Sequence, residues 1–391
     1  MSDARSEDDI APQIEWLARM VAHDTTSSKS NFSIVEDIEA YLAGFGIESH
    51  RVENDQGDKT NLYAVIGPST EGGVVLSGHT DVVPVDGQDW SSDPFSLTKK
   101  DDLYFGRGTC DMKAFSAIAL SLVPEMLDAD LRRPVILALS YDEEIGCLGA
   151  PRMIDRIASD LPRPEAVIVG EPTMMRVIDG HKGIAGFKTK VTGYTTHSSQ
   201  TDRGVSAVEA AARLISKLVE MRETRARDAD PESPFVPPYS SLTVNVVEGG
   251  TQLNIMAGEC TFDWDARVVP GETTADILAE ISDFAKGLEA QMRARSSECR
   301  IEIEQLTDVP PLRPDPDNPA TMLAKSLTGD NATGVVPYAA EAGQFQQAGL
   351  PTVICGPGSI DQAHQADEFI SHEQLVRGTA FQRALLRRLT A

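Results

Sequence analysis

The sequence predicts an α/β protein in which a mostly parallel, doubly wound sheet is interrupted by an inserted ferredoxin-like α+β domain. Up to Gly180, short apolar runs alternate with helical patterns, which is typical of a parallel sheet covered by helices on both faces. After Gly180 the order of elements changes to β-α-β-β-α-β, which describes a ferredoxin-like unit. Proline-rich stretches at 231–238 and 310–319 interrupt or flank this region. We therefore expect a larger domain at 1–179 and 311–391, with an inserted domain at 180–310.

In the first segment, apolar residues at helical spacing predict helices, and short apolar runs predict strands. The spacing of Ile14, Leu17 and Val21 indicates a helix within 10–25. The other predicted elements are helices at 34–45, after Asp111 and at 150–158, and strands at 62–67, 74–76, 134–140 and 166–170.

The same reasoning extends through the rest of the chain. The inserted segment is predicted to contain strands at 184–191, 242–247, 260–268 and 300–306, and helices at 204–220 and 275–295. The larger domain then resumes with a helix at 320–327, a strand at 352–355 and a last helix over about 372–389.

Composition excludes several classes of function. A net charge of -25 argues against binding to nucleic acid or to an anionic membrane surface. The five cysteines never form a C-x-x-C pair, which fits a reducing cytosol rather than a disulfide framework. The acidic start of the chain lacks the apolar core of a signal peptide, and no apolar run approaches membrane-spanning length. We therefore expect a cytoplasmic protein that contacts neither nucleic acid nor membrane.

Polar side chains directly follow three of the predicted strands. His79 and Asp81 follow the strand at 74–76, the pair Glu143 and Glu144 follows the strand at 134–140, and Glu171 follows the strand at 166–170. Because His79 and Asp81 are two residues apart, they point to the same side of an extended backbone. Ligands of open α/β sheets bind beyond the carboxyl ends of the strands, so these side chains predict a site there.

Asp111 lies in a turn marked by Gly106 and Gly108, at the mouth of a predicted helix. The unpaired amides of a first helical turn favour a carboxylate at such a position. Taken alone, Asp111 is explained as a helix cap and His79 as a surface histidine.

Together with His364, these residues form a set that suits a metal. Imidazole and carboxylate ligands favour Zn²⁺, Co²⁺ or Mn²⁺, and the five residues are His79, Asp111, Glu144, Glu171 and His364. Two divalent cations bring four positive charges, which three carboxylates and one hydroxide balance. The set therefore favours two metals that share one carboxylate, and Glu143 remains free to act as a base.

Five motifs in chain order resemble those of the aminoacylase, acetylornithine deacetylase and carboxypeptidase family of co-catalytic zinc hydrolases. They are Ser77–Pro84, Gly106–Lys113, Asp142–Glu144, Gly170–Thr173 and the late His364. The resemblance covers nearly the whole chain, including the inserted domain. It implies two Zn²⁺ ions per chain, with Co²⁺ possible, in a catalytic domain made of the first and last segments. It also implies that the inserted domain serves as a lid and forms a homodimer.

The resemblance also assigns roles to single residues. Asp111 resembles the bridging ligand, His79 and Glu171 the other ligands of one metal, and Glu144 and His364 those of the second metal. It implies that Asp81 orients His79, that Glu143 is the general base, and that the peptide bond between Asp111 and Met112 is cis.

Within the family, the run from Gly356 to Glu368 and the segments Glu341–Gly343, His181–Gly183 and His197–Ser199 most resemble the acetylornithine deacetylase branch. This implies a metal-dependent amidohydrolase that converts N²-acetyl-L-ornithine to L-ornithine and acetate. The same family leaves a succinyl-diaminopimelate desuccinylase or a carboxypeptidase open. A non-catalytic binding protein on the same scaffold is the alternative from another class.

Four further residues are candidates, and three of them have two explanations each. His197 is either a solvent-exposed or capping histidine, or, by the resemblance, a donor to the oxyanion in the partner subunit's site. Arg267 could grip a substrate carboxylate or pair with Asp265 or Glu259, and Asn254 is a further candidate substrate contact. Glu341 is either an acid at a helix start or a partner for a substrate ammonium group.

Overall fold

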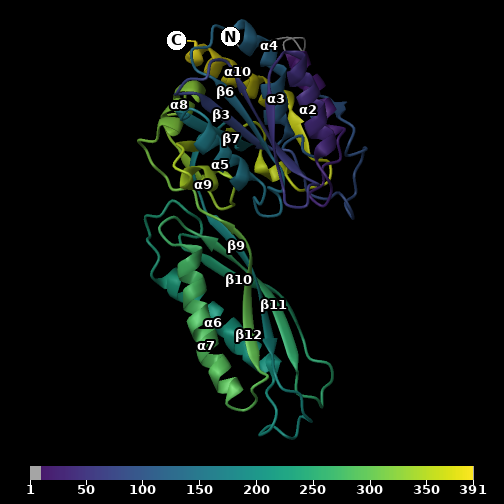
Figure 1. The fold of residues 1–391 in the computed structure, drawn as a ribbon, viewed down its shortest axis with the longest axis vertical. Coiled ribbons are helices and arrows are strands. Elements are labelled where there is room, and N and C mark those ends of the chain that lie inside the picture. The colour runs from purple at the N-terminus through teal and green to yellow at the C-terminus, as the bar shows by residue number, and fades with distance from the viewer. Residues whose placement is uncertain (1–9, 391) are drawn as a thin grey trace. The chain divides into compact units, whose positions relative to one another are not determined.

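The computed structural model describes residues 10–390, which divide into two compact units (Figure 1). One unit contains the chain up to Gly180, Pro314–Gly334 and the chain from Ala340 onward. The other contains His181–Arg313 and the short segment Val335–Ala339. Each unit has a hydrophobic core of its own.

An eight-stranded sheet forms the centre of the first unit. Its four middle strands, β6, β3, β7 and β14, run parallel, and β1, β2 and β8 pair antiparallel to their neighbours. In spatial order the strands are β1 (Ser49–Glu53), β2 (Thr60–Ile66), β6 (Val135–Ser140), β3 (Val74–His79), β7 (Ala166–Pro172), β14 (Thr352–Gly356), β8 (Ile178–His181) and β13 (Gly334–Val336). The three parallel strands that precede the predicted polar residues are therefore neighbours.

Helices cover both faces of this sheet. They are α1 (Ala11–Val21), α2 (Phe32–Gly44), α3 (Lys113–Ser121), α4 (Val123–Asp128), α5 (Ala150–Asp160), α8 (Pro319–Thr328), α9 (Ala342–Gln347) and α10 (His372–Leu389). Two successive residues of β3 show the two faces, because alternate residues of a strand point to opposite sides. The Ser77 hydroxyl approaches Glu341 at the start of α9, whereas a Cβ added to Gly78 would lie 2.7 Å from the Ser116 hydroxyl of α3.

A small antiparallel sheet completes the first unit. It consists of β15 (Phe369–Ser371), β5 (Leu103–Phe105) and β4 (Thr98–Lys100), and a 3₁₀ turn, η2 (Ile360–Gln362), precedes His364. The peptide bond between Asp111 and Met112 is cis, as expected.

The second unit is a four-stranded antiparallel sheet with two long helices. Its strands lie in the order β10 (Ser241–Gly249), β11 (Glu259–Val268), β9 (Gly183–Thr192) and β12 (Arg300–Val309). The helices are α6 (Ala207–Arg227) and α7 (Thr274–Arg293), and the order along the chain is β-α-β-β-α-β. Both helices have a capped N-terminus. The Ser206 side chain accepts from the Glu209 amide at the start of α6, and Thr273 forms a capping box with Asp276 at the start of α7.

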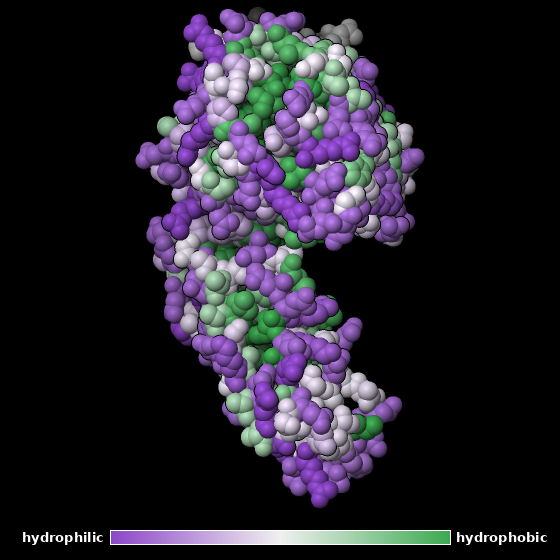
Figure 2. Space-filling model, viewed as in Figure 1, coloured by the Kyte–Doolittle hydropathy of each residue, from purple (hydrophilic) through white to green (hydrophobic). Residues whose placement is uncertain are grey.

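The predicted fold class is confirmed: a mostly parallel α/β sheet is accompanied by an antiparallel ferredoxin-like unit. The face of the molecule shown in Figure 2 is mostly hydrophilic, which accords with the net charge of -25. None of the helices within residues 10–390 is long and apolar enough to cross a membrane.

Candidate metal centre and active site

Three neighbouring parallel strands bring the polar residues to one edge of the sheet. His79 is the last residue of β3 and lies opposite Ser140, the last residue of β6. The turn that carries Glu143 and Glu144 follows Ser140 along the chain. Glu171 lies within β7, the neighbour of β3 on its other side. Residues that are 64 to 92 positions from His79 along the chain thus converge at the carboxyl ends of the strands.

Asp111 reaches this edge because α3 packs very closely on the sheet. A Cβ on Gly170 would lie 2.0 Å from the Phe115 ring, so glycine is required where this helix crosses β7. The capping role considered for Asp111 is wrong, because the N-cap of α3 is Met112 and no side chain caps the helix. The carboxylate instead lies between two imidazoles, 3.1 Å from His79 Nε2 and 3.3 Å from His364 Nε2.

Two groups of ligand atoms share Asp111. His79, Asp111 and Glu171 form one group and Asp111, Glu144 and His364 form the other, with the ligand atoms of each group within 4.8 Å of one another. In the second group, His364 Nε2 lies 2.9 Å from Glu144 Oε2. The structure thus brings together the five residues that the sequence indicated as metal ligands, with Asp111 common to both groups.

The donor set fits divalent cations. Nitrogen and oxygen donors of this kind are the usual ligands of Zn²⁺ and similar metals. Oε1 of Glu171 is buried and has no hydrogen-bond partner among the described residues, so a buried acceptor is left for a cation. Each group also contains one imidazole and two carboxylates, with Asp111 shared, and these balance much of a divalent charge.

Burial, together with the crowding of acids, raises the pKa of several carboxyl groups. Burial, followed by the charge of Asp111, raises the pKa of Glu171 well above its usual value and that of Glu144 to about 7. Burial, followed by the charge of Glu171, likewise raises the pKa of Glu143. Hydrogen bonds to Asp111 and then to Glu144 raise the pKa of His364 to about 10. These shifts show a site with an excess of negative charge, which positive ions would relieve.

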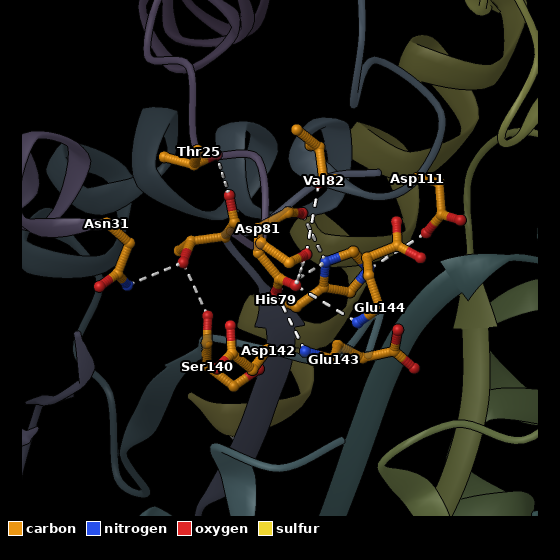
Figure 3. A network of polar contacts seen from close by, with 12 residues as sticks. Thr25, Asn31, His79, Asp81, Val82, Asp111, Ser140, Asp142, Glu143 and Glu144 are labelled. Atoms are coloured by element: carbon orange, nitrogen blue, oxygen red, sulfur yellow. Dashed lines mark hydrogen bonds and ion pairs between the residues drawn. The ribbon is translucent and has the colours of Figure 1, made fainter. Parts of the chain in front are cut away.

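Asp81 contacts the turn that carries the two glutamates (Figure 3). Its Oδ1 accepts a hydrogen bond from the Glu143 amide at 3.1 Å, and its Oδ2 accepts from the Glu144 amide at 3.3 Å and from the Ser27 hydroxyl at 2.7 Å. His79 Nδ1 lies 2.9 Å from the backbone carbonyl of Asp81 but 3.6 Å from its carboxylate. Asp81 therefore contacts His79 mainly through its backbone, while its side chain holds the Glu143–Glu144 turn.

Glu143 belongs to neither ligand group and is held by its own turn. Its backbone carbonyl accepts from the amides of Gly146 and Cys147, and the Cys147 thiol lies 3.4 Å from its Oε1. Lys59 donates to the neighbouring Asp142, which adds an ion pair on the other side of the turn. Glu143 is therefore a carboxylate beside both ligand groups that belongs to neither.

Comparison with known proteins identifies the chain. Residues 75–388 match the model of Peptidase family M20/M25/M40. The chain belongs to this family. A protein named acetylornithine deacetylase from Proteus mirabilis is 35% identical over 89% of this chain and 88% of its own length, and one from Photorhabdus laumondii is 32% identical over 92% and 93%.

Solved structures show the same fold. The M20 family metallo-carboxypeptidase Sso-CP2 from Sulfolobus solfataricus has a TM-score of 0.77 at 19% identity, and the alignment covers 97% of this chain and 99% of that chain. As a member of Peptidase family M20/M25/M40, the protein is a metal-dependent hydrolase that acts on amide bonds.

The predicted substrate contact Glu341 lies in the interior of the first unit. Only 1% of the residue is exposed, and its Oε2 is 3.5 Å from the Ser77 hydroxyl. Burial raises its pKa to about 7, and its Oε1 has no hydrogen-bond partner among the described residues. Glu341 is the N-cap residue of α9, and Gln344 of that helix donates to the carbonyl of Cys147. Glu341 is thus a buried acid near the end of the turn that begins at Glu143.

Three of the predicted residues belong to the second unit. His197 and Asn254 lie on adjoining loops, since the Asn254 carbonyl accepts from the Ser198 amide at 3.0 Å. His197 Nδ1 accepts from the Ser199 amide, so a neutral ring carries its proton on Nε2. Arg267, on β11, pairs with Asp265 at 3.1 Å, which is one of the alternatives that the sequence left open.

Two residues near the ligand groups had no role in the sequence prediction. Arg107 and Glu368 are both 1% exposed and form an ion pair, with 2.8 Å between Nη1 and Oε2. Arg107 lies within the segment Gly106–Lys113 and Glu368 ends the run from Gly356, both of which carry the family resemblance. A charged residue beside a glycine or another acid is, however, as common on a protein surface as in an interior ion pair. Only the fold shows that they are buried together.

Proposed function

We propose that this protein removes the acetyl group from N²-acetyl-L-ornithine and releases L-ornithine and acetate. The observation that carries the proposal is its similarity, along nearly the whole chain, to two bacterial proteins named acetylornithine deacetylase. The ligand groups around Asp111 support it, because none of the predicted ligand positions lacks a suitable side chain. That completeness argues against a non-catalytic binding protein.

We propose Zn²⁺ as the metal, with Co²⁺ as a substitute, and two ions per chain. His79 and Glu171 would hold one ion, Glu144 and His364 the other, and Asp111 both. Ions bound there would polarise the amide carbonyl and increase the acidity of a water molecule.

The protein's own residues supply the proton transfers. Glu143 is proposed to take the proton of the attacking water and to return it to the leaving amine. Its position is maintained by Asp81, which accepts from the amides of Glu143 and Glu144. A general base must lie within hydrogen-bond reach of the proton that it abstracts. The turn suits this role because hydrogen bonds hold the amides of Glu143 and Glu144 and the carbonyl of Glu143 in place.

We propose that the second unit forms a homodimer. Strand β10 lies at the edge of its sheet, and Val246 and Val247 on it are 47% and 54% exposed. Leu253, in the loop that follows, is 100% exposed. A second copy paired along this edge would cover apolar side chains and free backbone groups that otherwise remain in water.

In such a dimer, His197 is proposed to act in the site of the partner subunit. Its tautomer presents Nε2–H, the donor that a developing oxyanion requires. Arg267 and Asn254 are proposed to contact the substrate carboxylate, for which Arg267 must exchange its contact with Asp265. Glu341 is proposed as the partner of the ornithine ammonium group.

Specific activity on four substrates tests the proposal. Acetylornithine should be cleaved faster than acetylmethionine, succinyl-diaminopimelate and a C-terminal glutamyl peptide, because a site with buried polar partners rejects analogues that lack the matching group. If acetylornithine is the poorest of the four, the substrate assignment is wrong, while the amide hydrolase remains. Metal uptake without hydrolysis of any of the four would favour a binding protein.

A further inference from the structure

The carboxylate of Glu368 lies among hydrogen-bond donors from the turn that carries Asp111. Its Oε1 accepts from the amides of Cys110 at 2.8 Å and Asp111 at 3.0 Å, and its Oε2 accepts from the Gly108 amide at 2.9 Å. The Glu368 carbonyl in addition accepts from the Gly106 amide at 2.9 Å. Since Glu368 is 1% exposed, these donors replace water around its carboxylate.

Arg107 extends these contacts to the segment that carries His364. Its Nη1 donates to Glu368 Oε2 at 2.8 Å and to the Gln365 carbonyl at 3.2 Å, and its Nη2 donates to Gln88. The side chain of Gln88 in turn donates to the carbonyl of His364 at 2.9 Å. The backbone carbonyls of His364 and Gln365 are therefore tied to Arg107, the first through Gln88 and the second directly.

The His364 segment needs such support. His364 and Asp367 both have positive φ angles, 63° and 55°, which are costly for residues other than glycine and persist only where neighbouring contacts hold them. Asp367 is held by Ser91, whose amide and hydroxyl donate to its carboxylate at 2.8 and 2.9 Å. The side chain of His364 is itself 54% exposed, so packing alone does not fix the imidazole.

We propose that Glu368 and Arg107 are positioning residues that set the geometry of the ligand group formed by Asp111, Glu144 and His364. Glu368 fixes the Asp111 turn through three backbone amides, and Arg107 fixes the His364 segment through the Gln365 carbonyl and Gln88. The ion pair between them joins two ligands that are 253 residues apart, counted from 111 to 364. The proposal rests on the proposed function only in taking the metal to be a divalent cation bound by this group.

The variant Glu368→Gln tests the proposal with little change of shape. The amide nitrogen of Gln cannot accept a hydrogen bond, so donors that now face one carboxylate oxygen lose their acceptor. Zn²⁺ is titrated into metal-free full-length protein by calorimetry, without substrate. Because Asp111 belongs to both ligand groups, both equivalents should bind about 10- to 100-fold more weakly than in the wild type, the usual loss when a residue that orients a metal ligand is changed.

The matched control is Glu165→Gln. Glu165 also forms an ion pair with an arginine of the first unit, 2.6 Å from Arg133 Nη1, but it lies directly before β7, at the opposite ends of the parallel strands from the ligand groups. This variant should bind both equivalents of Zn²⁺ like the wild type. A general loss of stability would weaken binding in neither variant or in both, whereas a positioning role weakens Zn²⁺ binding in Glu368→Gln alone.

Gln88→Ala tests the same link if Glu368→Gln does not fold. It removes the side chain between Arg107 and the His364 carbonyl and leaves the ion pair intact, so only one of the two equivalents, the one held by His364, should weaken, by about tenfold or less. Unchanged affinity for both equivalents in the folded variants, or fewer than two equivalents in the wild type, would overturn the proposal. A wild type that binds two equivalents but does not cleave acetylornithine would refute the substrate assignment and leave this inference standing.

Discussion

The side chain of Asp81 offers a direct test of how the catalytic turn is held. The change Asp81→Asn keeps the shape but replaces one acceptor oxygen with a donor NH₂. In one orientation the NH₂ group replaces Oδ1 and faces the Glu143 amide. In the other it replaces Oδ2 and faces the Glu144 amide and the Ser27 hydroxyl. The hydroxyl can turn and accept, but an amide cannot. Either orientation therefore leaves one of the two amides facing a donor.

The expected magnitude follows from that count. A hydrogen bond to a charged group contributes about 1.5–3 kcal/mol, and Asp81 is 2% exposed, so water does not replace the lost acceptor. We expect the free energy of unfolding of the metal-free protein to fall by about 2–3 kcal/mol. The Glu143 carboxylate should also move, and a displacement of about 1 Å can reduce kcat about 100-fold.

Urea unfolding and steady-state kinetics measure both effects. The comparison variant is Ser27→Ala, which removes only the hydroxyl donor and should lower the free energy of unfolding by about 1 kcal/mol with little effect on kcat. If Asp81→Asn unfolds within about 0.5 kcal/mol of the wild type and retains its kcat, the side chain does not hold the turn and the reasoning is refuted.

Three further predictions concern the base, the second unit and the dimer. Glu143→Gln should bind metal normally but lose about 10²–10⁴-fold in kcat, whereas Glu144→Gln should bind less metal; near-normal turnover of Glu143→Gln would exclude it as the base. Burial lowers the pKa of His181 to about 4, so the folded state favours the neutral imidazole. The stability that this group contributes is therefore present above its ordinary pKa of 6.5 and declines as the pH falls toward 4. This group alone should cost about 2 kcal/mol between pH 7 and pH 5, and His181→Gln should show a correspondingly smaller decline in urea unfolding. Mixing His197→Ala chains with Glu143→Gln chains should restore activity in the heterodimer, and a fully active monomer by light scattering would argue against that arrangement.

The sequence was informative where a structural signal is local. The apolar runs of β3, β6 and β7 are contiguous, and each is followed by histidine or acids, so the strands and the edge where they end could be predicted together. The three-residue strands β5 and β15 could not, because such short segments have no periodicity and their pairing joins positions more than 260 residues apart, as between Phe105 and Phe369.

The roles of individual acids depended on backbone geometry that spacing does not show. The two-residue spacing of His79 and Asp81 predicts side chains on one side of an extended chain, but β3 ends at His79 and the Asp81 carboxylate faces other amides. Likewise, the amides near Asp111 are paired with Glu368, which lies far away in the sequence. Partners that are backbone groups leave no trace in the side-chain sequence, so neither contact could be predicted.

The most direct test of the account is the number of metal ions per chain. Elemental analysis of protein purified without chelator, and again after dialysis against excess zinc, measures this number. Two ligand groups that share Asp111 predict two equivalents of metal per chain. A chain that never takes up more than one equivalent, even with excess zinc, would contradict the two-metal site.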